Sequence, residues 1–217
     1  MANQEGVIKF RLDYTPTAAL PAVEVRQLNA WRQVMKLLGF IGQDPARYGG
    51  YGFGNISCRI KPFAAPPEQR RFIISGTQTG HLPALGPEHY ALVTACYPSE
   101  NRLVAGGPAK PSAESLTHGA VYAVDPALRW VIHVHSPQLW QQAEALKLPL
   151  TRPEVPYGSP EMAAEVARLL DEPEVRQLGL FSMGGHEDGL VAFGQTAEAA
   201  GTILLTYLAR ALELTQQ

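Results

Sequence analysis

VIHVHS, at residues 131–136, is the stretch from which the fold and chemistry of this chain are best predicted. In an extended strand, side chains alternate between faces. His133 and His135 therefore share one face, and Ile132 and Val134 share the other. Because the flanking residues are apolar, we expect the histidine face to be withdrawn from water. Two imidazoles at this spacing form half of a metal site, since imidazole suits zinc and its neighbours. Taken alone, the motif is equally compatible with a hydrogen-bonded pair of core histidines.

The composition is that of an ordinary globular protein. The 217 residues are 46% hydrophobic and 18% charged, with a net charge of −2. No basic stripe supports binding to nucleic acid or to a membrane surface. Two cysteines, Cys58 and Cys96, fit a reducing compartment rather than a disulfide framework. The first ten residues do not resemble a secretory signal, and no apolar stretch approaches the roughly 20 residues of a membrane span. We therefore expect a cytoplasmic protein.

Hydrophobic periodicity predicts a mixture of strands and helices. Strands are expected at 7–14, 55–60, 71–75, 89–97 and 129–136, with short strands in 178–185 and 189–194. Helices are expected from Pro21 to an end near Gly39 to Gly42, and at 112–124, 137–148, 160–171 and 196–214. Turns are expected at 61–70 and 106–111. Several strands look hairpin-joined, which favours a single α/β domain over residues 1–217, with a mixed or antiparallel sheet flanked by helices.

Two weaker patterns lie on either side of the histidine strand. In PSAESLTH, the Pro-Ser pair predicts a helix N-cap at or near Ser112, with Glu114 in the first turn and His118 one turn further on the same face. Alone, this is typical of a helix start with a solvated carboxylate. His186 lies in the glycine-rich turn of GGHEDGLVAFG, where glycines permit close backbone approach. A single histidine in a turn is usually no more than a polar residue on the surface.

The order of these motifs is more informative than any one of them. The chain presents GNIS (54–57), ISGTQTG (74–80), PSAES-x-x-H (111–118), HVHS (133–136) and GHEDG (185–189). This series resembles the class II aldolase/adducin family from about residue 25 to residue 212. The family includes fuculose- and rhamnulose-phosphate aldolases, ribulose-phosphate 4-epimerase and methylthioribulose-phosphate dehydratase. The resemblance implies a three-layer α/β/α domain with a central mixed, largely antiparallel sheet, in which residues 1–20 are an N-terminal extension.

The resemblance also implies roles for individual residues. The implied metal ligands are His133, His135 and His186, and the implied general base is Glu114. The positions that match substrate-phosphate contacts are Asn55, Ser75, Gly76 and Ser112; their hydroxyl and amide groups beside a helix N-terminus suit an anion. The implied cofactor is a divalent metal, with Zn²⁺ as the first candidate and Mn²⁺, Fe²⁺ or Co²⁺ as alternatives.

The implied activity is that of a metal-dependent carbon–carbon lyase. It would act on a small-molecule ketose sugar or sugar phosphate through a metal-stabilised enediolate. Dehydration or 4-epimerisation of a related sugar phosphate is the alternative, and a non-catalytic adducin-like binding protein is a third. The family further implies a homo-oligomer, typically a tetramer, and a second acid or base that is often supplied by a neighbouring subunit. Tyr157 and Tyr207 are the candidates for that group in this chain.

Three departures from the family pattern bear on specificity. Ala113 stands where the aldolases often have a second serine, which resembles the dehydratase branch. Glu187 follows His186 where the family usually has glycine, so its carboxylate could hold His186 or repel an anionic substrate. The strand at 7–14 and the insertion at 61–70 alter the rim. For the remaining polar and aromatic residues we expect simpler roles, with His118 near the metal but not bound to it, surface positions for His81 and His89, and packing for Tyr122, Trp130 and Trp140.

Overall fold

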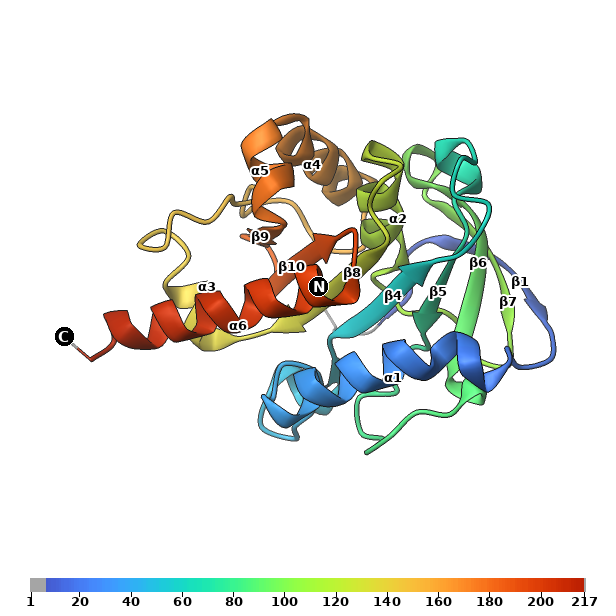
Figure 1. Ribbon diagram of the computed structural model, residues 1–217, viewed down its shortest axis with the longest axis horizontal. Coiled ribbons are helices and arrows are strands. Elements are labelled where there is room, and N and C mark those ends of the chain that lie inside the picture. Colours follow the sequence, from blue (N-terminus) through green and yellow to red (C-terminus); the bar gives the residue numbers. More distant parts are fainter. Residues whose placement is uncertain (1–6, 217) are drawn as a thin grey trace.

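The histidine strand is an interior strand of the main sheet (Figure 1). The computed structural model describes residues 7–216, and within them eight strands form one sheet in the order β1-β7-β6-β5-β4-β8-β10-β9. Its strands are β1 (Arg11–Pro16), β4 (Asn55–Arg59), β5 (Phe72–Ser75), β6 (Tyr90–Tyr97), β7 (Arg102–Gly107), β8 (Trp130–His135), β9 (Leu180–Ser182) and β10 (Gly189–Gly194). A separate small sheet pairs β2 (Gly42–Gln43) with β3 (Gly52–Phe53).

Helices cover both faces of the main sheet, so the expected three-layer α/β/α arrangement is confirmed (Figure 1). The helices are α1 (Ala22–Leu37), α2 (Ser115–Val124), α3 (Pro137–Gln141), α4 (Pro160–Asp171), α5 (Pro173–Leu178) and α6 (Ala197–Leu214). One core cluster joins Val131 to apolar residues of α2, α4 and α5, and the other joins Ile132 and Val134 to those of α1, α3 and α6. By strand alternation, His133 and His135 project toward the α2, α4 and α5 layer.

The sheet is mixed and largely antiparallel, as expected. Of its pairings in the described chain, only β1 with β7 is parallel. On one side β8 pairs with β4, which places Asn55 opposite His133. On the other side β8 pairs with β10, which places Gly189 opposite His135. The sheet register therefore brings GNIS, HVHS and the turn after His186 to one end of three adjacent strands.

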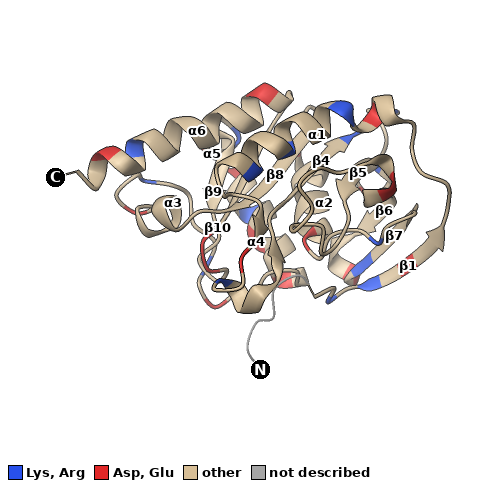
Figure 2. Cartoon of the chain, turned by 90° about the horizontal axis from the view of Figure 1, so that it is seen from below, with Lys and Arg blue, Asp and Glu red and all other residues tan. Residues whose placement is uncertain are grey.

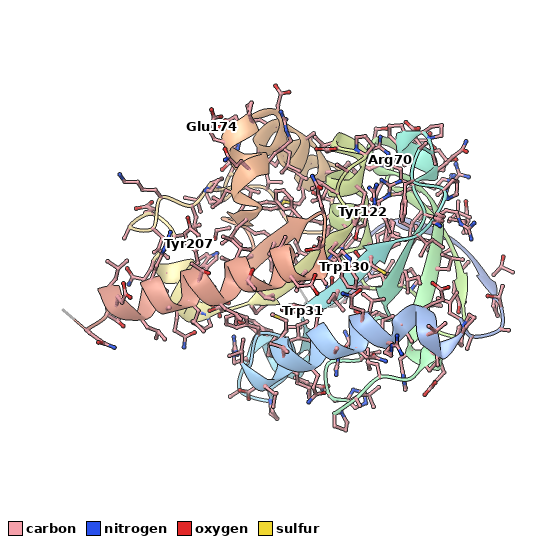
Figure 3. The ribbon with its side chains drawn as sticks, viewed as in Figure 1. Trp31, Arg70, Tyr122, Trp130, Glu174 and Tyr207 are labelled. Carbon is pink, nitrogen blue, oxygen red and sulfur yellow. The ribbon has the colours of Figure 1, made fainter. Side chains whose placement is uncertain are left out.

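Two glycines allow close approach between layers. A Cβ at Gly119 of α2 would lie 2.2 Å from Sγ of Cys96, so the glycine lets α2 lie close to β6. A Cβ at Gly201 of α6 would lie 2.0 Å from the Trp31 ring, which α1 extends toward α6 (Figure 3). Real Cβ atoms do not approach other atoms this closely, so larger residues at either position would separate the layers.

Some boundaries differ from those expected. The predicted strand 7–14 begins at Arg11, although the predicted alternation holds and Phe10 is buried. The predicted turn 106–111 was wrong at its start, because Gly106 and Gly107 are the last residues of β7, which pairs with both β6 and β1. Neither β7 nor α5 was expected.

Charged residues of both signs are mixed on the view of the described chain in Figure 2, along helices, strands and loops. Across the residues that the structure describes, no helix combines the length and the apolarity needed to cross a bilayer.

Candidate metal centre

Three histidines that are far apart in the sequence meet at one end of the sheet. His133 and His135 extend from β8, and His186 comes from the turn that joins β9 to β10. A ring nitrogen from each lies within 4.8 Å of the others, and the Nε2 atoms of His133 and His135 are 3.2 Å apart. All three side chains are buried. The expected withdrawal of the histidine face from water is confirmed.

The His186 turn is shaped by backbone hydrogen bonds and by glycine. The amide of His186 donates to the Met183 carbonyl, and the amide of Gly189 donates to the His186 carbonyl. A Cβ at Gly185 would lie 2.3 Å from the Val155 carbonyl oxygen, and one at Gly189 would lie 3.1 Å from the His186 ring. The glycines around His186 therefore allow the turn to pack tightly against neighbouring backbone, as the sequence suggested.

The protonation of these histidines suits a divalent cation. Burial lowers the pKa of His135 well below its usual range, and the neighbouring His186, His133 and Arg47 lower it further. Burial also lowers the pKa of His186, although Glu114 and Asp188 oppose the shift. Nδ1 of His133 lies 3.0 Å from the Leu190 carbonyl, which can only accept, so this nitrogen carries the proton and Nε2 keeps its lone pair. In the neutral form, imidazoles offer lone pairs that suit zinc and the neighbouring transition metals.

Glu114 lies beside the histidines. Its Oε1 is 3.9 Å from Nδ1 of His186, and its Oε2 accepts a 3.0 Å hydrogen bond from the Thr117 hydroxyl. Glu114 is only 2% exposed, so the alternative of a solvated carboxylate was wrong. The predicted helix boundary also needs correction, because Glu114 itself is the N-cap of α2. Ser112 lies before the helix, where its hydroxyl accepts from the Glu114 amide at 3.3 Å.

His118 is buried on the same side of the sheet but lies outside the group of three. Its Nδ1 is 2.7 Å from the hydroxyl oxygen of Ser57, which is in turn 2.7 Å from that of Tyr122. Burial lowers the pKa of His118 well below its usual range, and nearby His133 adds to this. His118 is therefore a neutral core histidine held by β4 and α2.

These buried histidines predict an acid-sensitive fold. In the folded protein the pKa values of His118 and His135 lie well below 6.5, whereas in the unfolded chain they return to about 6.5. The unfolded state then binds more protons, so the free energy of unfolding falls as pH drops below about 6.5. At about pH 5.5 the loss is at most about 1.4 kcal/mol for each histidine, the limit in which the folded state takes up no proton. Urea unfolding of metal-free protein at about pH 5.5 and pH 7.5 measures it, and equal stabilities would contradict buried neutral rings.

A small polar pocket opens next to Glu114. It is lined by Gly52, Gly54, Asn55, Gly76, Thr77, Gln78, Thr79, Gly80, Ser112, Ala113 and Glu114. The structure thus brings together three of the four predicted phosphate positions, Asn55, Gly76 and Ser112. Ser75 is not among the lining residues, and its buried hydroxyl accepts a hydrogen bond from the Ile56 amide at 3.2 Å. Oδ1 of Asn55 is buried and has no hydrogen-bond partner within the described part of the chain.

The two candidate tyrosines lie in different layers. The Tyr157 ring stacks on the His186 ring, with centroids 4.3 Å apart and an interplanar angle of 18°, and Nζ of Lys9 lies 3.5 Å from the Tyr157 ring centre. Tyr207 lies on α6 (Figure 3). It packs in the cluster of Ile132 and Val134, which strand alternation places on the other side of the sheet from the histidines.

Sequence reasoning missed three residues at this centre, which are Arg47, Tyr48 and Asp188. The Glu187 side chain is exposed, whereas the next residue, Asp188, is buried. Asp188 accepts a 2.5 Å hydrogen bond from the Tyr48 hydroxyl and lies 3.6 Å from NH2 of Arg47. The only sequence signal for this contact was the Gly- and Tyr-rich stretch RYGGYGFG, which carries no indication of its partner.

Comparison with known families and structures gives a consistent result. A family profile described as the class II aldolase and adducin N-terminal domain matches residues 46–215. The L-fuculose-1-phosphate aldolase of Thermus thermophilus superimposes with a TM-score of 0.64 at 19% identity, covering 90% of this chain and 94% of that one.

Two further structures extend the likeness. YgbL of Klebsiella pneumoniae, a candidate aldolase/epimerase/decarboxylase, matches with a TM-score of 0.62 at 18% identity and covers 91% of each chain. A sugar-phosphate aldolase of Thermotoga maritima matches with a TM-score of 0.61 at 16% identity, covering 89% of this chain and 95% of that one. At such identities, these likenesses establish the fold.

Proposed function

Because this chain belongs to the class II aldolase and adducin family, we propose that it is a metal-dependent lyase that cleaves a carbon–carbon bond of a ketose sugar or sugar phosphate. The observation that carries the proposal is the buried group of His133, His135 and His186, with the carboxylate of Glu114 beside it. A non-catalytic member of the family has no need for this set of four side chains. The proposed lyase function accounts for all of them.

The three histidines would hold one divalent cation, with zinc as the first candidate and manganese, iron or cobalt as alternatives. Three protein ligands leave a coordination position for substrate, as in catalytic rather than structural zinc sites. When bound, the cation would act as a Lewis acid toward the carbonyl and hydroxyl oxygens of a ketose. His133 is oriented for this role by its Nδ1 bond to the Leu190 carbonyl.

Glu114 is placed to move the proton. Its carboxylate adjoins His186, is shielded from bulk water, and is fixed by the Thr117 hydroxyl. A general base needs to be within hydrogen-bond reach of the proton that it removes, and a fixed carboxylate beside the cation meets this need. We assign Glu114 the proton transfer at the carbon next to the substrate carbonyl.

The polar pocket would bind the anionic or hydroxylated end of the substrate. Asn55 and Ser112 offer polar side-chain groups, Gly76 allows backbone approach, and the N-terminus of α2 favours negative charge. Ser75 contributes indirectly in this proposal, because its bond to the Ile56 amide fixes β4 next to Asn55. The unpaired Oδ1 of Asn55 supports a ligand that brings a hydroxyl donor.

Dehydration or epimerisation of a related sugar phosphate is the second candidate. Ala113 favours it, because a hydroxyl that the aldolases often carry is missing from the pocket lining. The second acid or base would distinguish the reactions. Of the two candidate tyrosines, Tyr157 is better placed because its ring contacts His186. A homotetramer remains our proposal for the assembly, by analogy with the family.

A substrate screen tests the proposed reaction. Protein loaded with Zn²⁺, Mn²⁺ or Co²⁺ is incubated with ketoses and ketose phosphates, and the products are analysed for retro-aldol cleavage, loss of water and inversion at C4. Aldehyde release that is abolished by a chelator is the expected result. Dehydrated or epimerised product would select the second candidate, and no turnover of any compound by metal-loaded protein would count against an enzyme of this class.

A further inference from the structure

The loop that precedes β3 has an unusual backbone. Tyr48, Gly49 and Gly50 have successive positive φ angles of 49°, 67° and 80°. Glycine adopts this left-handed region freely, but a tyrosine does so at a cost of about 1–3 kcal/mol. Asp188, in the turn after His186, also has a positive φ of 61°. Two non-glycine residues with left-handed backbone thus occur in segments 140 positions apart and contact each other.

Their contact is a short, half-buried hydrogen bond. The Tyr48 hydroxyl lies 2.5 Å from Oδ2 of Asp188, and NH2 of Arg47 lies 2.6 Å from the same hydroxyl oxygen. Burial and the Asp188 bond raise the pKa of Tyr48, so the phenol keeps its proton. Tyr48 therefore donates to Asp188 and accepts from Arg47, so two hydrogen bonds hold its hydroxyl group. The Asp188 carbonyl also accepts from the amide of Ser136, the residue after His135.

This arrangement confines the ring of His135. The Tyr48 ring meets His135 edge-on, with centroids 4.6 Å apart and an interplanar angle of 64°. Phe53 lies 5.5 Å from His135 and 5.1 Å from Tyr48, and the Arg47 guanidinium lies over both aromatic rings. The two aromatic rings restrict rotation of the imidazole, whose Nε2 points toward His133.

We propose that Tyr48, held by Asp188, is a positioning residue that fixes the His135 ring for metal binding. The inference rests on the proposed metal site and concerns its affinity rather than its reaction. The hydroxyl bond ties the loop with the strained Tyr48 backbone to the turn after His186, so without it we expect the loop to relax away from His135. Groups that orient a metal ligand typically contribute ten- to a hundred-fold to affinity. Asp188, rather than Glu187, is thus the supporting acid of the GHEDG motif.

Metal affinity of the parent protein and a set of variants tests the inference. Tyr48→Phe keeps the ring and removes the donor, and Asp188→Asn keeps a residue that tolerates positive φ. Zn²⁺ affinity is measured by competition with a chromophoric chelator, and the visible spectrum of Co²⁺-loaded protein reports the ligand geometry. Two controls match the variants. Glu187→Gln alters the adjacent acid, and Tyr14→Phe removes a tyrosine hydrogen bond at the sheet edge, to the Gly107 carbonyl.

We expect Tyr48→Phe to weaken Zn²⁺ binding about ten-fold and to alter the Co²⁺ spectrum. The double variant, which carries both Tyr48→Phe and Asp188→Asn, should lose no more Zn²⁺ affinity than the single variant that binds Zn²⁺ more weakly. Both controls should bind as the parent does. A purely structural role would instead lower the unfolding temperature and leave metal affinity unchanged, which would overturn the inference. Additive losses in the double variant would also overturn it. If the parent itself binds no metal, the proposed function fails. If the parent binds metal and the variants bind it equally well, only this inference fails, so the two failures are distinguishable.

Discussion

Glu114→Gln is expected to lower the turnover number by about a thousand-fold or more while the protein keeps its fold and its metal. General-base catalysis contributes about 10²–10⁴-fold, and an amide has no basic oxygen at neutral pH. The amide oxygen can still accept the Thr117 hydroxyl, so the start of α2 should be undisturbed. The measurement is kcat on the ketose or ketose phosphate identified by screening, together with metal content and circular dichroism of the same sample.

Glu161→Gln is the matched control for this experiment. Glu161 lies in the first turn of α4 and is exposed, so the same chemical change occurs at another helix start without touching the site. The control should retain the parent turnover. If Glu114→Gln retained it too, the proton transfer would have to be assigned to another residue, and Tyr157 would be the first to examine because its ring contacts His186.

His133→Ala is expected to weaken divalent-metal binding by at least about a hundred-fold. The change removes one of three ligands, whereas loss of a group that only orients a ligand already costs about ten- to a hundred-fold. Metal should raise the unfolding temperature of the parent, because a ligand that binds only the native state stabilises it, and the variant should lose this shift. Calorimetry with and without Zn²⁺ measures both quantities.

His89→Ala provides the comparison for His133→Ala. His89 is only partly buried in a short turn before β6, and its Nδ1 accepts from the Gly86 amide. Its removal should leave the metal-dependent rise in unfolding temperature unchanged. A His133→Ala protein that folds and still shows the full rise would place the metal elsewhere.

Local patterns predicted most of the architecture. Strand alternation placed His133 and His135 on one face, and helix periodicity located α1, α4 and α6 within a few residues. Such patterns depend only on near neighbours in the sequence, which is why they are reliable. β7 was missed because RLVAGG is short and ends in two glycines, and its pairing with β1 joins residues about 90 positions apart.

The site was only partly predictable for the same reason. The order of motifs indicated Glu114 and the three histidines, and the structure brings these four together. The contact between Tyr48 and Asp188 could not be predicted, because it depends on two positive φ angles and on a 140-residue separation. Ser75 illustrates the opposite error, since a motif position does not show whether the side chain faces the pocket or the backbone of the next strand.

Elemental analysis of untagged protein tests the central claim most directly. The parent, incubated with zinc, manganese, iron or cobalt and then freed of unbound ion, is measured beside His133→Ala with its fold verified by circular dichroism. The account predicts one tightly held divalent ion for each chain of the parent and none in the variant. A parent that retains no metal under any of these conditions would contradict a metal-dependent lyase and leave only the fold of the family.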